Sequence, residues 1–311
     1  MSEAALAEAI AAAAPAKINL ALHVTGRRGP GERFEGHHEL DTLVSFASHG
    51  DVIRVEPNGD DLALAVGGPH AEALKRACPK AGDNLAVRAA AALRTLAERN
   101  GIPRPLSGWG AAISIEKNLP VASGMGGGSA DAAAAIDALV RMWDLPRSMK
   151  GVGDLLAFLG ADVPMCLVRH SLRARGIGEL IERVALPGCP VVLVNPGRPV
   201  ATPDVFRHLD GRFSGPLPAL PDRPSLDDLL DWLATTSNDL EAPAIALEPA
   251  IGKALDALRS MPGCRFARMT GSGATCFGLF PRAQDARAAG DMLQSANAAW
   301  WVAPTRLVDF A

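Results

Sequence analysis

The 311-residue chain contains no tyrosine at all, and aromatic residues make up only 5% of it. Its five cysteines form no Cys-x-x-Cys pair and show no Cys/His spacing of the kind that binds zinc. This pattern predicts a protein of the reducing cytoplasm without a structural zinc site. The formal net charge is only −3, which argues against a protein that binds nucleic acid or membrane surfaces.

Long apolar runs are missing as well. No run of about eighteen uncharged apolar residues occurs, so the sequence predicts no transmembrane helix. The alanine-rich N-terminus lacks a basic start and contains Glu3 and Glu8, which argues against a signal peptide. We expect residues 1–13 to be a partly disordered lead-in. The length allows two domains, and we expect a monomer or a weak homodimer.

One glycine-rich loop stands out against this background. Four glycines occur within five positions and are followed at once by alanine-rich helix formers: Gly124, Gly126, Gly127 and Gly128. Glycine permits positive φ and the close approach of a ligand, and the N-terminus of the next helix presents unpaired N–H groups. The loop therefore predicts a phosphate site. The alternative is a tight turn that binds nothing.

The loop does not match the two best-known phosphate motifs. No lysine separates the glycines from Ser129, so it is not a Walker A loop. Read from Gly124 it gives G-x-G-x-x-S, and the acidic residue nearest to the position that a dinucleotide fold requires, Asp144, lies where the helix ends. A Rossmann oxidoreductase is therefore only a minor alternative.

Alternation and turn residues predict the rest of the chain as short strands and helices. We expect strands at 14–24, 40–46, 51–55, 62–66, 111–117, 165–168, 190–195, 264–269, 275–280 and 300–308, and a hairpin connection at 173–181. We expect helices at 84–100, 129–144, 148–159, 226–233, 238–258 with a break near Pro243 or Pro249, and 283–297. Residues 210–225 are rich in proline and glycine and are predicted to form a surface loop.

The sequence contains two closely spaced pairs of polar residues that are candidates for binding. Lys17 and Asn19 share one face of the first strand, so they either serve a phosphate or a substrate hydroxyl, or belong to a solvated strand face. His37 and His38 are adjacent and therefore point to opposite faces of a strand, which makes them a poor metal pair.

Asp162 lies in a turn before Pro164, where it could simply cap the turn.

Three blocks, read together, resemble the GHMP kinase superfamily: Pro15-Ala-Lys17-Ile-Asn19-Leu, Leu119-Pro120-x-x-x-Gly124-Met-Gly-Gly-Gly-Ser129-Ala and Met269-Thr270-Gly271-Ser272-Gly273-Ala274. Further pieces resemble the branch whose members phosphorylate a cytidyl-diphosphate sugar alcohol: Asp83-Asn84-Leu, Gly160-Ala-Asp162-Val-Pro164, Asn195-Pro-Gly197 and Thr202-Pro203-x-x-Phe206. The resemblance implies a two-domain α+β fold with mixed and antiparallel sheets and a cleft. It implies a nucleotide-binding domain over residues 1–168 and a ferredoxin-like substrate domain over residues 169–311.

The resemblance also implies roles for individual residues. Asp162 would be the catalytic base and Lys17 its charge partner. The residues implied to bind ATP are Asn84, Lys117, Pro120, Val121, Ala122, Ser123, Gly124, Met125, Gly126, Gly127, Gly128, Ser129 and Ala130. Those implied to bind the substrate are Asn19, His37, His38, Thr202, Phe206, Gly271 and Ser272. Mg²⁺ is expected with ATP, and Ser129 is the implied ligand.

The chain departs from the family pattern at two points. Where the family typically has Asp-Gly-Tyr-His, this chain has Glu35-Gly36-His37-His38, so His37 replaces a tyrosine that would stack on the substrate. The preceding loop, Arg27 to Phe34, is longer than usual. Asp131 follows the glycine loop closely, and we expect its carboxylate to point outward, away from bound phosphates.

The rival hypotheses differ in class. Within the superfamily they are a mevalonate or homoserine kinase and a diphosphomevalonate decarboxylase. Outside enzymes, the rival is a nucleotide-binding regulator without catalysis, which would require Lys17 or Asp162 to be missing from its motif. Both residues are present.

Overall fold

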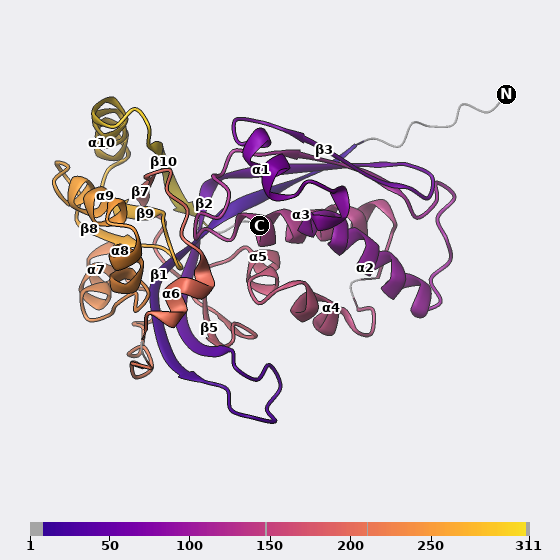
Figure 1. Cartoon of the computed structure of the whole chain (residues 1–311), viewed down its shortest axis with the longest axis horizontal. Coiled ribbons are helices and arrows are strands. Elements are labelled where there is room, and N and C mark those ends of the chain that lie inside the picture. The colour runs from indigo at the N-terminus through magenta and orange to yellow at the C-terminus, as the bar shows by residue number, and fades with distance from the viewer. Residues whose placement is uncertain (1–8, 147, 210, 309–311) are drawn as a thin grey trace. The chain divides into compact units, whose positions relative to one another are not determined.

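The computed structural model describes residues 9–146, 148–209 and 211–308 (Figure 1). These residues divide into two compact units, each built from segments that are not contiguous in sequence. The first unit comprises 9–14, 50–121 and 127–167, and the second comprises 15–49, 122–126 and 168–308. The division into a nucleotide-binding domain (1–168) and a substrate domain (169–311) stays a prediction. It is defined by what each domain binds, whereas the two units are defined by contacts within the chain.

The first unit combines a small sheet with a layer of helices. Its sheet pairs β3 (Leu62–Gly67) in parallel with β4 (Ala111–Glu116), which in turn pairs antiparallel with the second half of β2 (His38–Pro57). Its helices are α1 (Ala71–Ala77), the 3₁₀ turn η1 (Ala81–Asp83), α2 (Leu85–Arg99), α3 (Gly127–Met142), α4 (Val152–Leu159) and α5 (Val163–Val168). Figure 1 shows α2 and α3 packed along each other, and both bury mostly alanines on the shared side, which permits close approach.

The second unit is an antiparallel sheet covered by helices. Its strands follow the order β2–β10–β7–β9–β8, and β1 and the β5–β6 hairpin also join β2. The strands are β1 (Ile10–Arg27), β5 (Leu172–Gly176), β6 (Leu180–Arg183), β7 (Pro190–Asn195), β8 (Phe266–Met269), β9 (Cys276–Leu279) and β10 (Trp301–Val308). The helices are α6 (Thr202–Arg207), α7 (Leu226–Ala234), α8 (Glu241–Leu247), α9 (Ala250–Arg259) and α10 (Ala283–Ala296).

The core of the second unit lies between this sheet and two of its helices. In Figure 1, α9 and α10 lie beside β7, β9 and β10. Apolar side chains of β7, such as Val192 and Val194, pack there with Leu255 and Leu258 of α9. This packing buries a continuous apolar face and gives the unit its own core.

Most predicted elements are confirmed, and the mixed α+β class is confirmed with them. The prediction of a strand at 165–168 was wrong, because this segment belongs to the helix α5. The two strands expected at 40–46 and 51–55 are one continuous strand, β2. Residues 10–13, expected to be disordered, already belong to β1, whereas residues 1–8 lie outside the described part of the chain. The sequence did not predict α1 or α6.

Two properties of the described chain bear on its environment. No described helix is long and apolar enough to cross a membrane. None of the five cysteines, all of which lie in the described part, forms a disulfide. Cytoplasmic location stays a prediction.

Candidate functional site

Two glycine turns of the second unit lock into each other. A Cβ on Gly124 would lie 2.6 Å from the carbonyl oxygens of Thr270 and Gly273, and a Cβ on Gly271 would lie 2.5 Å from the Gly124 oxygen. All three glycines also have positive φ. The backbone N–H of Lys17 donates to the Met125 oxygen at 3.0 Å. The close approach that the sequence predicted at Gly124 is therefore made by the protein itself.

The last glycine of the loop differs from the others. Gly128 is exposed in the first turn of α3, and a Cβ there would meet nothing within 4 Å. Gly127, beside it, is fitted closely against the protein, since a Cβ would lie 3.2 Å from the Lys117 ammonium. The first N–H groups of α3 have no acceptor within the helix. The start of α3 thus offers N–H donors and the positive end of a helix dipole beside an open glycine.

A buried charged triad lies directly beneath this turn in the first unit. The Lys117 ammonium contacts Asp51 Oδ2 at 2.6 Å and Asp131 Oδ2 at 2.8 Å, and all three side chains are at most 3% exposed. The other Asp51 oxygen accepts the backbone N–H groups of Asn118 and Leu119. The triad ties β2, the end of β4 and the first turns of α3 together.

The position of Asp131 corrects an expectation. Its carboxylate points inward, to Lys117, rather than outward from the loop as predicted. Its Oδ1 atom is buried and accepts no hydrogen bond among the described residues. Burial raises the pKa of Asp131 to about 7; the Lys117 ammonium opposes this rise, and the Asp51 carboxylate adds to it. The same two carboxylates outweigh burial at Lys117 and raise its pKa.

Lys17 and Asn19 are buried in β1, which excludes the solvated strand face; they are 4% and 2% exposed. The Asn19 backbone N–H donates to Thr270 Oγ1, and its amide donates to Thr42 Oγ1, each at 2.8 Å. Asn19 Oδ1 is buried without a donor among the described residues, and it lies 3.5 Å from a Cβ placed on Gly271. A buried acceptor of this kind ordinarily has a donor, either from the protein or from a bound molecule.

Asp162 occupies the residue before α5. Its carbonyl oxygen accepts the Cys166 N–H at 3.0 Å, so it stands at the N-terminus of this helix. The partial positive charge there stabilises a carboxylate. Asp162 belongs to the first unit and Lys17 to the second.

Aromatic residues gather in the second unit. The His38 and Phe206 rings stack with centroids 4.6 Å apart and planes at 22°, and Phe213 meets His38 edge-on at 6.3 Å. Burial lowers the pKa of His38, and the charges of Arg27 and His37 lower it further. His37 itself lies edge-on to Phe34, so it is not part of the stack.

The remaining predicted residues are placed as follows. Thr202 Oγ1 and Ser272 Oγ share a hydrogen bond of 2.7 Å in the second unit. Asn84 is the N-cap of α2, where its side chain accepts the Ala86 N–H at 2.9 Å. No sequence motif indicates Asp51 of the triad or Phe213 beside His38. Nothing local distinguishes either residue, because each acquires its partners only through long-range contacts.

Comparison with known proteins points to the same family as the three sequence blocks. The model of the GHMP kinases N terminal domain matches residues 84–170, and that of the GHMP kinases C terminal domain matches residues 217–299. A 4-diphosphocytidyl-2-C-methyl-D-erythritol kinase of Cereibacter sphaeroides (strain ATCC 17029 / ATH 2.4.9) is 48% identical over 95% of this chain and 98% of its own length. The kinase of the same name from Paramagnetospirillum magneticum is 43% identical over 95% of this chain and 97% of its own.

A solved structure agrees as well. The crystal structure of a 4-(cytidine 5'-diphospho)-2C-methyl-D-erythritol kinase is 34% identical to the chain, with a TM-score of 0.74, covering 96% of this chain and 100% of that one. The resemblance found in the sequence is confirmed by these matches along nearly the whole length. The chain therefore belongs to the GHMP kinase family.

Proposed function

We propose that this chain transfers the γ-phosphoryl group of ATP to the 2-hydroxyl of 4-diphosphocytidyl-2-C-methyl-D-erythritol, which yields the 2-phosphate and ADP in terpenoid biosynthesis by the non-mevalonate pathway. The observation that carries the proposal is the 48% identity, over 95% of the chain, to a relative named for this kinase. The buried, unpaired acceptor of Asn19 and the open start of α3 add chemistry that fits it.

The glycine loop would hold the phosphates of ATP. The residues concerned are Pro120 to Ala130, and the open space at Gly128 supports the approach of a phosphate there. Lys117 would act on the nucleotide through the turn that it supports, since its ammonium already contacts two carboxylates. Asn84 would lie on the adenosine side.

Mg²⁺ would come with the nucleotide. Among the described residues, no group of three or more His, Cys, Asp or Glu side chains could hold a metal ion. Phosphate oxygens would therefore supply part of the coordination, as is usual for Mg²⁺ with nucleotides. Ser129, in the first turn of α3, is the candidate protein ligand. The ion would neutralise part of the negative charge of the phosphates.

Asp162 and Lys17 would carry the chemistry. Asp162 would accept the proton of the substrate's 2-hydroxyl as its oxygen forms the bond to the γ-phosphorus. The bond to the β–γ bridging oxygen breaks, and its electron pair leaves with ADP. Lys17 would balance the negative charge on the transferred group.

The cytidyl and erythritol parts would contact the second unit. Phe206 and His38 offer ring faces for the base, whereas Asn19, Thr202 and Ser272 offer polar atoms near Gly271. His37 would take the place of the tyrosine found elsewhere in the family, as an edge rather than a member of the stack.

A coupled assay of ADP release tests the proposal. We expect turnover with the cytidyl substrate and none with mevalonate or homoserine. Asp162→Asn is expected to lower kcat by orders of magnitude while ATP still binds. Release of ADP with mevalonate or homoserine alone would support the alternative family reactions, and no turnover with any alcohol would support a non-catalytic regulator.

A further inference from the structure

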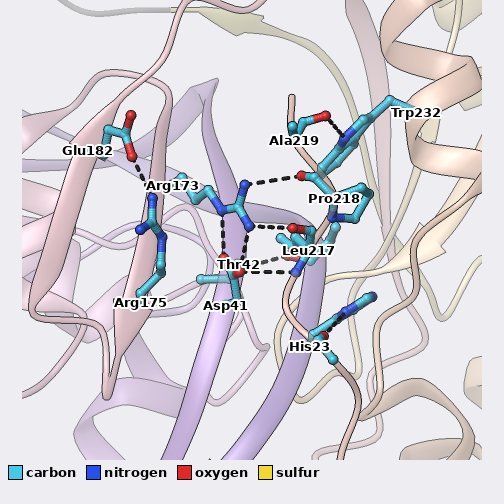
Figure 2. Close-up of polar contacts among 12 residues, drawn as sticks. His23, Asp41, Thr42, Arg173, Arg175, Glu182, Leu217, Pro218, Ala219 and Trp232 are labelled. Carbon is cyan, nitrogen blue, oxygen red and sulfur yellow. Dashed lines mark hydrogen bonds and ion pairs between the residues drawn. The ribbon is translucent and has the colours of Figure 1, made fainter. Parts of the chain in front are cut away.

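The segment of residues 213–219, here called the strap, has neither helix nor strand, yet it is held firmly in the second unit. At its centre lies an ion pair: Arg173 Nε and Nη2 contact the two Asp41 carboxylate oxygens at 2.8 and 2.6 Å (Figure 2). Asp41 is only 2% exposed. A bidentate pair of this kind fixes geometry as well as charge.

Both residues of this ion pair also form hydrogen bonds with the backbone of the strap. Asp41 Oδ2 accepts the Leu217 N–H at 3.0 Å, and Arg173 donates to the carbonyl oxygens of Leu217 at 2.6 Å and Pro218 at 3.1 Å. Figure 2 shows these contacts converging on one short stretch of the strap. The pair therefore joins β2 and β5 to the loop backbone, and it satisfies backbone groups that would otherwise be left without partners.

Each side of the ion pair has further anchors. The Ser214 N–H donates to the Val24 oxygen at 2.9 Å, and His23 Nδ1 donates to the Gly215 oxygen at 2.8 Å. At the other end, Trp232 Nε1 of α7 donates to the Ala219 oxygen at 3.0 Å (Figure 2). Contacts to β1, β2, β5 and α7 thus hold the strap along its length.

This anchoring has one visible consequence at the start of the strap. Phe213 is 46% exposed although the next residue is anchored to β1. Its ring meets His38 edge-on at 6.3 Å, on a ring that also stacks on Phe206. These distances lie in the range of real aromatic contacts. An exposed phenylalanine held against the His38 ring, which itself stacks on Phe206, is placed to meet a flat ligand.

We propose that Phe213 is a specificity-determining residue that contacts the base of the nucleotide-linked substrate, and that the Asp41–Arg173 pair is the positioning device that holds it there. The inference rests on the proposed function, because it assigns the His38–Phe206 stack to the base. It adds a residue that none of the sequence blocks includes. Phe213 completes an aromatic surface of three rings.

The chemistry of this surface selects a planar ring rather than a phosphate. Phe206 and Phe213 are uncharged, and burial together with the charges of Arg27 and His37 lowers the pKa of the third ring, His38. Stacking on aromatic faces is tolerant of the base, so Phe213 contributes affinity for the nucleoside part. Loss of one stacking residue costs roughly 5- to 100-fold in affinity.

The first experiment compares Phe213→Ala with the wild type in steady-state kinetics and in calorimetric binding of cytidine diphosphate. We expect the KM for the cytidyl substrate and the Kd of cytidine diphosphate each to rise roughly 5- to 100-fold. The KM for ATP and kcat should stay unchanged, since only ground-state binding of the base is removed. Phe213→Trp should restore the affinity.

The second experiment tests the positioning role. Asp41→Asn is expected to raise the KM for the cytidyl substrate, and adding Phe213→Ala should raise it little further, because both changes remove the same contact. Arg175→Met is the matched control, since Arg175 forms an exposed ion pair with Glu182 at 2.6 Å on the same hairpin (Figure 2). Arg175→Met should change neither the KM for the cytidyl substrate nor the Kd of cytidine diphosphate. Thermal unfolding reports whether Asp41→Asn is folded.

The outcomes separate this inference from the proposed function. Wild-type turnover with an unchanged KM and Kd in Phe213→Ala would overturn the inference alone. Binding of cytidine diphosphate that Phe213→Ala weakens, without turnover of the cytidyl substrate, would overturn the proposed reaction and support the inference. A wild type that neither turns over the substrate nor binds cytidine diphosphate would overturn both.

Discussion

Gly124 and Gly128 lie four residues apart in one loop and face different neighbours. At Gly124 the backbone of the 270–274 turn fills the space that a side chain would need, and φ is +79°. At Gly128 nothing lies within 4 Å of a Cβ, and the residue belongs to α3, where alanine is the better helix former. The folded protein by itself therefore requires glycine at 124 but not at 128.

This contrast predicts opposite effects for the two alanine variants. Gly128→Ala should keep the free energy of unfolding or raise it by up to about 1 kcal/mol. It should raise the KM for ATP by roughly tenfold or more, because the methyl group would occupy the space of a phosphate. Gly124→Ala should lower the free energy of unfolding by about 2 kcal/mol or more. Urea unfolding and steady-state kinetics measure both quantities. An unchanged KM for ATP in Gly128→Ala would mean that no phosphate approaches this position.

The buried carboxyl of Asp131 predicts a pH dependence of stability. Its pKa rises to about 7 in the folded protein, from an ordinary value near 3.8. Between these values the folded state holds a proton that the unfolded state has lost, so the stabilisation is present at low pH and is lost as the pH rises through about 7. The free energy of unfolding of the wild type should therefore fall by roughly 2 to 4 kcal/mol relative to Asp131→Asn between pH 4 and pH 7.5.

Urea unfolding of both proteins across this pH range measures the difference. Asp137→Asn serves as the control, because Asp137 lies on the same helix, pairs with Arg141 and takes no part in the triad. A protonated Asp131 would be contradicted if the free energy of unfolding of the wild type, relative to that of Asp131→Asn, stayed constant or rose between pH 4 and pH 7.5.

At the scale of elements, the helices and strands with a clear period or cap were predictable. The sequence offers Asp83 or Asn84 as the N-cap of α2 and Gly101 as its end; the structure uses Asn84, whose side chain caps the first turn, and Gly101 adopts positive φ. The Leu62–Gly67 strand and the hairpin of β5 and β6 also follow from local patterns. Local chemistry alone decides these elements.

The errors occurred where the local pattern is ambiguous. A run such as Met165-Cys-Leu-Val is too short for periodicity to separate a buried strand from a buried helix. Here Asp162 starts a helical turn, and the run continues it as α5. The short helix α6 begins beside Pro203 and was likewise not apparent from its six residues.

The site was predictable only in part for a related reason. The glycine loop, Lys17 and Asp162 stand in motifs that the sequence displays. The inward turn of Asp131 depends on Asp51, which lies eighty residues earlier in the chain. The buried face of α3 leaves no solvent on that side, so a carboxylate there must find a cation. No local pattern reports a partner at that separation.

At the scale of the whole molecule, the two units are joined by shared strands. Residues 10–14 of β1 belong to the first unit and 15–27 to the second, and β2 is divided in the same way at residue 49. Each of these two strands therefore runs without a break from one unit into the other. We therefore expect a single cooperative unfolding transition, as in a two-state domain.

Ligands should shift that one transition as a whole. At a hundred times its Kd, either Mg²⁺-ATP or cytidine diphosphate should add about 2.7 kcal/mol to the free energy of unfolding. Calorimetry should then show one peak that each ligand moves to higher temperature, with equal calorimetric and van't Hoff enthalpies. At the same ligand concentrations, Gly128→Ala should reduce the shift with Mg²⁺-ATP by about half or more and keep that with cytidine diphosphate, and Phe213→Ala should do the reverse. Two peaks, of which each ligand moves only one, would show that the shared strands do not couple the units.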